Sequence, residues 1–269
     1  MGEGKALVIS INYYDSTCQL NGCINDGINI CDILINKFNM KKEDILFLHD
    51  NPDNIGSDTY PTADNIRKAL RYIVMSKPKK LWISYSGHGS SIRDYMGDEV
   101  DGMDEVLCPV DYANKIGRSL QERFIFDDEL SDILKRLPSD CQCFALFDCC
   151  HSGTIVDLEY MYDFNKYKYC RQTYRKYNKC NASITSVSGC KDNQTSADAY
   201  IGGNYSGAMT YAFIKAVSEN SILNYIDLVK YMRKTLHESN YSQIPQLTSN
   251  EKNTNGIFYI SKEIKSMFP

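Results

Sequence analysis

Short β-rich runs alternate along this chain with longer segments in which apolar residues recur at helical spacing. The β-rich runs are residues 6–11, 45–48, 81–85, 143–147, 183–188 and 256–260. Most of them lack an alternation of polar and apolar positions, which is typical of strands buried on both faces. We therefore predict that they form strands of one mostly parallel sheet.

Five segments between these runs have an apolar face at helical spacing. They cover residues 24–38, 66–74, 130–137, 209–217 and 228–236, and Thr62 is expected to cap the second. Helices of this kind cover both faces of a parallel sheet, so the predicted fold class is a three-layer α/β sandwich. In such folds ligands bind beyond the carboxyl ends of the strands.

Two segments interrupt the alternation. Residues 160–180 are rich in Tyr, Lys, Arg and Asn without a clear period, and residues 91–104 are acidic and punctuated by glycine. We expect a long exposed loop in the first segment and a solvated loop in the second. Long loops inside a compact domain are usually functional or disordered.

Composition limits the class of protein. The chain has 269 residues, 43% of them hydrophobic, which suits one domain with a full core. A net charge of -4 argues against a general nucleic-acid or membrane-surface binder, which needs a basic field. Because no apolar run of membrane-spanning length and no leader is recognisable, we expect a soluble, cytoplasmic protein.

The chain contains eleven cysteines. Their odd number, together with the missing leader, favours reduced thiols over a disulfide scaffold. The pairs Cys141 with Cys143 and Cys149 with Cys150 lack the spacing of a structural zinc site.

Two of the predicted strands end in groups that can do chemistry. Leu81-Trp-Ile-Ser-Tyr-Ser-Gly-His-Gly89 ends in a histidine between glycines, and Phe144-Ala-Leu-Phe-Asp-Cys-Cys-His-Ser-Gly153 ends in a carboxylate, two thiols and an imidazole. An imidazole activates a thiol and protonates a leaving amine, so His88 and Cys150 are a candidate catalytic pair. The main-chain N–H groups of Gly89 and Cys150 could form an oxyanion hole. The alternative is a buried cysteine and a structural histidine.

The residues around this pair resemble those of metacaspases, which are cysteine peptidases with the caspase fold. The resemblance rests on Tyr85-Ser-Gly-His-Gly89 and Asp148-Cys-Cys-His-Ser-Gly153, and it extends from about Lys5 to Ile260. Further similar segments are 104–112, 126–130, 188–199 and 207–213. The order of the segments is similar to that of type I members, and it implies a caspase-like α/β sandwich.

The resemblance also implies roles for individual residues. The nucleophile is the cysteine directly before His-Ser-Gly, which is Cys150, and the base is His88. Cys149 is expected to pack inward, because adjacent strand residues point to opposite faces. The substrate pocket is expected to be lined by Cys23, Asp26, Ser86 and Asp148. Two carboxylates in one pocket attract Arg or Lys and repel Asp.

Many metacaspases need calcium, and the resemblance implies a Ca²⁺ site. Its carboxylates are expected at Asp104, Asp127, Asp128 and Asp157. Oxygen ligands suit calcium, and gathering these side chains without a cation would be repulsive. The alternative is that Asp127 caps the helix after it, with Asp128 favouring the helix dipole. The connection from Asp111 to Phe126 is longer than usual for the family, which makes the spacing within this site less secure.

The family also implies a division of the single domain, 1–269, into large-subunit-like and small-subunit-like segments. These are residues 1–160 and 182–269, separated by an exposed processing loop at 161–181. We expect self-cleavage in the loop, with candidate positions Lys166, Lys168, Arg171, Arg175, Lys176 and Lys179. The core motifs begin close to the first residue, so no prodomain is expected, and the resemblance implies a monomer.

Three functions are compatible with these observations. The first is a calcium-assisted cysteine endopeptidase that cuts protein or peptide substrates after Arg or Lys. The second is a non-catalytic caspase-fold module for interaction or calcium sensing, against which the intact His88 and Cys150 argue. The third is a legumain-like peptidase that prefers Asn, against which Asp26 and Asp148 argue.

Overall fold

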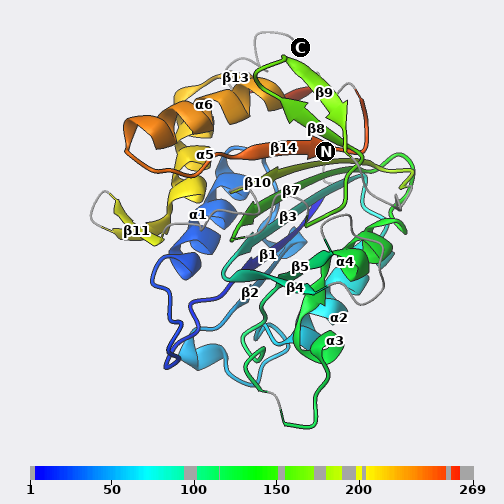
Figure 1. Cartoon of the computed structure of the whole chain (residues 1–269), viewed down its shortest axis with the longest axis vertical. Helices are drawn as coiled ribbons and strands as arrows, with labels where there is room; N and C mark the ends of the chain where they lie inside the picture. Colours follow the sequence, from blue (N-terminus) through cyan, green and yellow to red (C-terminus); the bar gives the residue numbers. More distant parts are fainter. Residues whose placement is uncertain are drawn as a thin grey trace.

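The computed structural model describes residues 4–93, 102–114, 116–150, 155–172, 180–189, 198–201, 204–252 and 256–260. A central sheet runs through the molecule in the order β2-β1-β3-β7-β10-β14-β8-β9 (Figure 1). Its strands are β1 (Gly4–Ser10), β2 (Ile45–His49), β3 (Lys80–Ser86), β7 (Gln142–Asp148), β8 (Tyr160–Asp163), β9 (Lys168–Arg171), β10 (Ser183–Ser188) and β14 (Gln246–Ser249). Neighbouring strands from β2 to β10 are parallel, whereas β14, β8 and β9 pair antiparallel.

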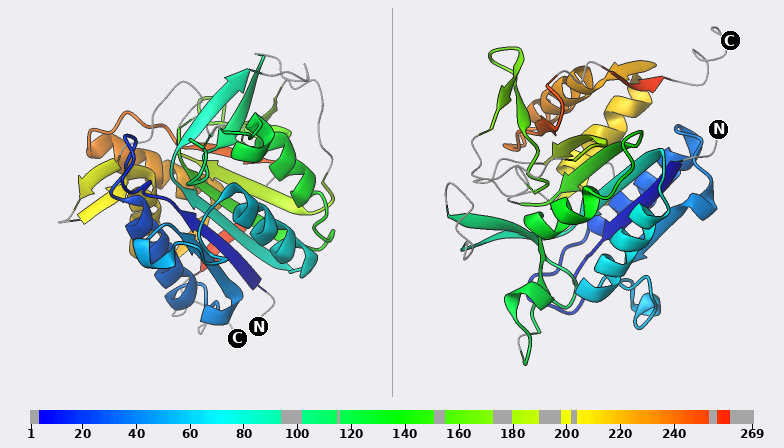
Figure 2. Two further views of the ribbon diagram at one scale, coloured as in Figure 1. Left: turned by 90° about the horizontal axis from the view of Figure 1, so that it is seen from below. Right: turned by 90° about the vertical axis from the view of Figure 1, so that its right-hand side faces the viewer.

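Helices cover both faces of this sheet (Figure 2). One face carries α1 (Cys23–Asn36), α5 (Ala208–Glu219) and α6 (Tyr225–Glu238), and the other carries α2 (Ala63–Met75), α3 (Leu120–Arg123) and α4 (Asp127–Leu134). Two short 3-10 helices, η1 (Lys42–Asp44) and η2 (Pro52–Asn54), flank β2. The predicted three-layer α/β class with the caspase-like arrangement is confirmed.

The sequence of β1 explains why the sheet is covered twice. Leu7 and Ile9 pack into a core with α2 and α4, whereas Ala6 and Val8 pack into a second core with α1, α5 and α6. Successive side chains of a strand point to opposite faces, so an uninterrupted apolar run requires a helical layer on each side. Thr62 caps α2 as predicted, with its hydroxyl accepting a hydrogen bond from the main-chain N–H of Asn65.

The expectation of one long exposed loop over residues 160–180 was wrong in its first half. Residues 160–171 form the β8–β9 hairpin, which extends the central sheet beyond β14. Its aromatic side chains explain this, because Tyr162 is buried and packs with Phe164 and Tyr169 in the core beside α6. Residues 173–179 lie outside the described residues.

Three smaller sheets were also not predicted in this form. They comprise β4 (Gly89–Arg93), β5 (Met103–Leu107) and β6 (Ile125–Phe126); β11 (Asp198–Ile201) and β12 (Asn204–Gly207); and β13 (Ile222–Asn224) and β15 (Ile257–Ile260). The run at 256–260 is therefore a strand, but it pairs with β13 instead of joining the central sheet. The expected acidic loop is partly β4 and β5, with residues 94–101 outside the described residues.

The parallel strands place their carboxyl ends along one edge. Ser86 at the end of β3 pairs with Ser10 of β1 on one side and with Asp148 of β7 on the other, and Ser188 of β10 pairs with Phe147. The chain leaves β1 toward one edge of the sheet and β3 toward the other, which makes this pair a topological switch point. Ligands bind at such points, so the predicted location of the site agrees with the fold.

Among the residues that the structure describes, no helix combines the length and the apolar character needed to cross a membrane. Within the same residues, no disulfide joins two cysteines.

Candidate active site

The loops after β3 and β7 meet at Gly89. A Cβ atom at Gly89 would lie 2.1 Å from the carbonyl oxygen of Cys150 and 3.2 Å from the sulfur of Cys149. No side chain fits at that distance, so glycine permits the close approach of the two loops. The fold therefore brings the main chain next to His88 against the main chain of Cys150, as the sequence predicts for a catalytic pair. Both His88 and Cys150 are partly exposed.

The imidazole of His88 contacts the loop that follows β1. Its Nε2 lies 2.6 Å from the carbonyl oxygen of Cys18. A carbonyl oxygen only accepts hydrogen bonds, so Nε2 carries the proton and Nδ1 is the basic nitrogen of the neutral ring. Cys18 thus orients the ring through its main chain.

Two buried tyrosines hold the main chain of His88. The Tyr13 hydroxyl accepts a hydrogen bond from the His88 N–H at 2.8 Å, and the Tyr85 hydroxyl donates to the His88 carbonyl oxygen at 2.8 Å. The two hydroxyls also contact each other at 3.0 Å, and both reach the carbonyl oxygen of Cys108. Burial raises the pKa of both tyrosines well above the ordinary value, so both hydroxyls stay protonated.

The neighbouring cysteines differ from Cys150 in their surroundings. Cys149 is fully buried in the core on the α2 face, which confirms that it packs inward. Cys108 is also buried, and burial raises the pKa of its thiol to about 12. A thiol with such a pKa stays protonated and unreactive at neutral pH. His151 of the motif lies outside the described residues.

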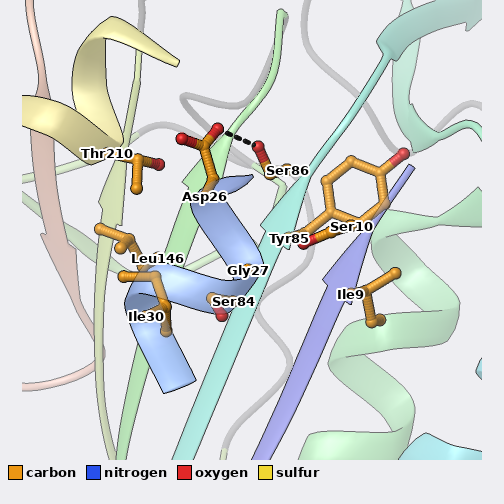
Figure 3. A pocket seen from close by; sticks show the side chains of 10 residues that line it. All are labelled: Ile9, Ser10, Asp26, Gly27, Ile30, Ser84, Tyr85, Ser86, Leu146 and Thr210. Atoms are coloured by element: carbon orange, nitrogen blue, oxygen red, sulfur yellow. Dashed lines mark hydrogen bonds between the residues drawn. The ribbon is translucent and has the colours of Figure 1, made fainter. Parts of the chain in front are cut away.

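A second group of polar side chains lies beside this site, around Asp26 in the first turn of α1. The Asp26 carboxylate is 1% exposed and accepts hydrogen bonds from the Ser86 hydroxyl at 2.7 Å and from the Ser206 hydroxyl at 2.6 Å. The main-chain N–H of Gly207 lies 3.0 Å from each of its oxygens. Figure 3 shows Asp26 reaching from α1 toward Ser86 at the end of β3.

Asp148, the last residue of β7, joins the same group. Its carboxylate is 4% exposed and accepts hydrogen bonds from the main-chain N–H and the hydroxyl of Thr210, at 2.9 and 2.8 Å. Asp148 thereby caps the N-terminus of α5, where Gly207 has no side chain to do so. The fold brings together three of the four expected pocket residues, and Cys23, the fourth, is the buried first residue of α1.

The ionisation of Asp26 is shifted by this environment. Burial, and after it the charge of Asp148, raises the pKa of Asp26 to about 8, although the hydrogen bonds from Ser206, Ser86 and Gly207 lower it. A carboxyl group with this pKa holds its proton at neutral pH. Burial and the neighbouring negative charge both favour the protonated form of Asp26.

The four carboxylates expected to bind calcium lie on β5, at the start of α4 and between β7 and β8. Asp104 on β5, Asp127 at the start of α4 and Asp157 are buried. Asp127 does not cap α4, because it is the first helical residue; its carboxylate accepts hydrogen bonds from the main-chain N–H groups of Glu105 and Asp128. Asp157 has a φ of +48°, in the left-handed region.

The carboxylate oxygens of these residues are suitable ligands for calcium, but only some of the residues lie on neighbouring segments. Asp104, Asp127 and Asp128 lie on adjoining segments, since β5 pairs with β6 directly before α4. Within the described residues, no three Asp, Glu, His or Cys side chains gather closely enough to hold a metal ion. Burying several carboxylates favours a nearby positive charge.

The expected processing positions fall in two places. Lys166 lies between β8 and β9, whereas Lys168 and Arg171 lie on β9. Lys166 forms an ion pair with Asp163, and Arg171 forms one with Glu159. Arg175, Lys176 and Lys179 lie outside the described residues.

Similarity to known proteins agrees with this geometry. A family model described as metacaspase, peptidase C14 domain, matches residues 4–159. Metacaspase-1 of Schizosaccharomyces pombe is 35% identical over 301 residues, which cover 92% of this chain and 67% of the relative. The chain belongs to the metacaspase family. The family model is described as that of a peptidase, and metacaspases are cysteine peptidases.

Other relatives and solved structures agree on family and fold. Metacaspase-1 of Saccharomyces cerevisiae is 36% identical over 92% of this chain and 66% of the relative, so the chain spans about two thirds of such relatives. A crystal structure of protein GSU0716 from Geobacter sulfurreducens superposes with a TM-score of 0.65 at 21% identity, covering 96% of this chain and 98% of that one. The structure of pro-sf-caspase-1 matches with a TM-score of 0.52 at 12% identity, covering 92% and 91%. Both share the fold of this chain, and the similarity to pro-sf-caspase-1 shows that this fold is caspase-like.

Several residues of this metacaspase site were not singled out from the sequence. Cys18 acts through its carbonyl oxygen, which leaves no signal in the side chain. Ser206, Gly207 and Thr210 reach Asp26 and Asp148 from α5 and the strand before it, some 180 positions from Asp26 in the case of Ser206. The metacaspase-like segment 207–213 pointed to this region without giving it a role.

Proposed function

We propose that this metacaspase is a cysteine endopeptidase that cleaves after Arg or Lys, with Cys150 as nucleophile and His88 as general acid and base. The observation that carries the proposal is the convergence of two buried carboxylates, Asp26 and Asp148, at the strand ends that also carry His88 and Cys150. When these carboxylates bind the cationic side chain of a substrate residue, the scissile main-chain carbonyl group of that residue would lie near the Cys150 thiol.

The proposed reaction proceeds through an acyl enzyme. His88 takes the proton of the Cys150 thiol through Nδ1, since Nε2 is engaged by Cys18. The thiolate attacks the carbonyl carbon, and the main-chain N–H groups of Gly89 and Cys150 stabilise the oxyanion. His88 then protonates the leaving amine, and a water molecule, deprotonated by His88, hydrolyses the thioester.

A panel of fluorogenic peptides tests the specificity. Peptides with Arg, Lys, Asn or Asp at the cleavage position should be cleaved only when the residue is Arg or Lys. Preference for Asn would instead support the legumain-like reading, and cleavage of none would support a non-catalytic module. The substitution Asp148→Asn should strongly reduce cleavage after Arg, while the melting temperature should fall only slightly.

The nucleophile is tested by a matched pair of variants. Cys150→Ala should abolish peptide cleavage, whereas Cys149→Ala should retain it, because Cys149 is a packing residue in the core. Activity that survives in Cys150→Ala would overturn the proposed mechanism.

We also propose that calcium assists the enzyme through Asp104, Asp127, Asp128 and Asp157. Bound there, the ion would neutralise the buried carboxylates and link β5 and α4 to the segment after Cys150. Main-chain carbonyl groups and water molecules can complete the oxygen ligands of calcium at such a site.

Calcium binding can be measured without activity. Titration of the apo protein with CaCl₂, followed by calorimetry and by the shift in melting temperature, should show one site that Asp104→Asn together with Asp127→Asn removes. The control Asp132→Asn changes an exposed carboxylate on the same helix, which pairs with Lys135. Unchanged calcium affinity in the double variant would exclude this site.

Self-processing is proposed for residues 161–181. A protease binds its substrate in an extended conformation, and the β9 positions Lys168 and Arg171 are already paired with β8. Cleavage is therefore expected first at Arg175, Lys176 or Lys179. Mass spectrometry of the purified enzyme after addition of calcium checks this, with Cys150→Ala as control. An intact loop in a fully active enzyme would exclude self-processing.

A monomer is proposed from the shape of the sheet. The β8–β9 hairpin extends the sheet beyond β14, so the edge strand is β9, which has four residues and carries Lys168 and Arg171, and short, charged edge strands disfavour pairing with a second chain. Light scattering coupled to gel filtration should give the mass of a single chain. Cytoplasmic location stays a prediction.

A further inference from the structure

Gly207 lies between the two carboxylates of the pocket. A Cβ atom at this position would lie 2.2 Å from one oxygen of Asp148 and 2.8 Å from one oxygen of Asp26. Two buried carboxylates thus approach the main chain at position 207, and the side chain at this position can only be a hydrogen atom. Gly207 has φ -63° and ψ 132°, a conformation open to any residue, so the need for glycine comes from the carboxylates and not from the backbone.

Neutral groups surround the Asp26 carboxylate on most sides. Hydroxyls reach it from Ser86 on β3 and Ser206 on β12, and the main-chain N–H of Gly207 completes its recorded hydrogen bonds. The charged group that acts on it is Asp148 from β7. Two like charges this close, both shielded from water, favour a state in which one of them is neutral.

We propose that the pair formed by Asp26 and Asp148 holds one proton when the pocket is empty, and that the cationic side chain of the substrate displaces this proton. The inference rests on the proposed specificity for Arg or Lys. Bond changes are limited to one O–H bond, which breaks and delivers its proton to water, while the guanidinium or ammonium group supplies the compensating positive charge beside the two carboxylates. Before the exchange the pair carries one negative charge, and afterwards it carries two, facing one positive charge.

A small cavity on the inner side of Asp26 gives the carboxylate polar surroundings. It has a volume of about 10 Å³, room for one water molecule, and Ser10, Ser84, Ser86 and Thr210 are among its lining residues (Figure 3). The hydroxyls of Ser10 and Ser84 are buried without a hydrogen-bond partner in the protein. Buried hydroxyls of this kind pair with internal water, and such an environment helps Asp26 to ionise once a cation arrives.

Proton exchange makes cation binding depend on pH in a defined way. The pKa of Asp26, raised to about 8 by burial and by Asp148, sets the upper limit of the window. Below it each bound cation releases one proton, so affinity should rise about tenfold per pH unit between about pH 6 and pH 7.5. Above about pH 8 the affinity should level off.

Calorimetry on the Cys150→Ala enzyme measures this exchange directly, because that variant removes the thiol of the catalytic pair and cannot cleave the ligand. The ligand is a tetrapeptide amide that ends in Arg, and the control ligand ends in citrulline, its neutral isostere. Titrations at pH 6.5 in phosphate and in imidazole buffer, which differ in ionisation enthalpy, give the number of protons released. We expect close to one for the Arg peptide.

Two further variants test the Asp26 carboxylate and the space at position 207 separately. With Asp26→Asn added, the Arg peptide should bind through Asp148 alone, with no proton released and little dependence on pH. Gly207→Ala, whose backbone is compatible with alanine, should weaken the Arg peptide at least tenfold and leave the citrulline peptide unchanged. Circular dichroism confirms that each variant is folded.

The outcomes distinguish this inference from the specificity on which it rests. Tighter binding of the Arg peptide than of the citrulline peptide, without proton release at pH 6.5, would overturn the exchange and leave the basic specificity intact. Equal binding of the two peptides would overturn both. Proton release that persists in Asp26→Asn would also overturn the assignment to this pair.

Discussion

Single atoms decide the geometry of the catalytic pair, and Gly89 is the clearest case. In Gly89→Ala the added Cβ would meet the main-chain carbonyl oxygen of Cys150 at 2.1 Å, and main chain cannot move aside as a flexible side chain can. We expect at least a hundredfold loss of kcat/KM in peptide cleavage, since small displacements of reacting groups have effects of this size. The control Gly256→Ala adds a Cβ where nothing lies within 4 Å. Wild-type activity in Gly89→Ala would contradict this account of the two loops.

The Tyr13 hydroxyl is a second case at this scale, because it positions His88 without contacting substrate. Tyr13→Phe removes the acceptor for the His88 N–H and the donor to the Cys108 carbonyl oxygen. Leaving the buried N–H without this partner costs about 1–3 kcal/mol. We expect kcat to fall about tenfold with KM little changed, because the pocket around Asp26 is untouched.

The control for this variant is Tyr72→Phe, which changes an exposed hydroxyl on α2. Steady-state kinetics and the pH profile of kcat distinguish positioning from general destabilisation. If Tyr13→Phe raised KM and left kcat unchanged, the hydroxyl would act on the substrate pocket and not on His88.

Residues that act through side chains at strand ends could be predicted from the sequence. Asp148 follows an apolar run directly, and His88 and Cys150 follow such runs within three residues, so these polar groups at the ends of buried strands are conspicuous. Cys18 and Gly207 could not be predicted in the same way. Their contributions, a carbonyl oxygen and the absence of a side chain, exist only through contacts with residues far away in the chain.

At the scale of elements, the buried parallel strands were predictable, whereas most of the described antiparallel strands, with the exception of β15, were not. Each parallel strand from β1 to β10 coincides with one of the predicted β-rich runs, and both of its faces lie under helices. In contrast β14 reads Gln-Leu-Thr-Ser, and β9 reads Lys-Tyr-Cys-Arg. Such short polar strands depend on their neighbours in the sheet, which a local pattern does not contain.

The β8–β9 hairpin depends on an arginine of α6. The Arg233 guanidinium lies 3.7 Å from the centre of the Phe164 ring, and its Nε donates to the Pro245 carbonyl oxygen at 2.7 Å. Burial lowers the pKa of Arg233 to about 10, so the side chain is still charged at neutral pH. Partly desolvated contacts between a cation and an aromatic ring contribute about 1–2 kcal/mol.

Arg233→Met should therefore loosen the hairpin while retaining much of the apolar contact. We expect amide hydrogen exchange in residues 160–171 to become about tenfold faster, with the exchange of β3 and β7 unchanged. Lys230→Met is the matched control, since Lys230 lies 5.9 Å from the Tyr167 ring and is half exposed. Equal exchange in both variants would show that the hairpin is held by the aromatic cluster alone.

At the scale of the whole molecule, the pocket has a cost in stability that depends on pH. In the folded protein Asp26 keeps its proton up to about pH 8, whereas an aspartate of the unfolded chain loses it near pH 4. Between these values the folded state binds more protons than the unfolded state. The free energy of unfolding therefore falls as pH rises, by up to about 1.4 kcal/mol per pH unit from this group.

Asp26→Asn removes this dependence, because a carboxamide is neutral at every pH and places no second negative charge beside Asp148. We expect the variant and the wild type to melt at similar temperatures near pH 4.5. Its melting temperature should exceed that of the wild type at pH 8, by about 2–4 °C for each kcal/mol of this difference in a chain of this size. The same variant should be impaired in cleavage after Arg. Thermal unfolding from pH 4.5 to 8.5 measures the difference, and Asp53→Asn, in η2 outside the pocket, serves as the control. A variant that is less stable than the wild type at pH 8 would mean that Asp26 is ionised in the free enzyme and that its charge is compensated within the fold.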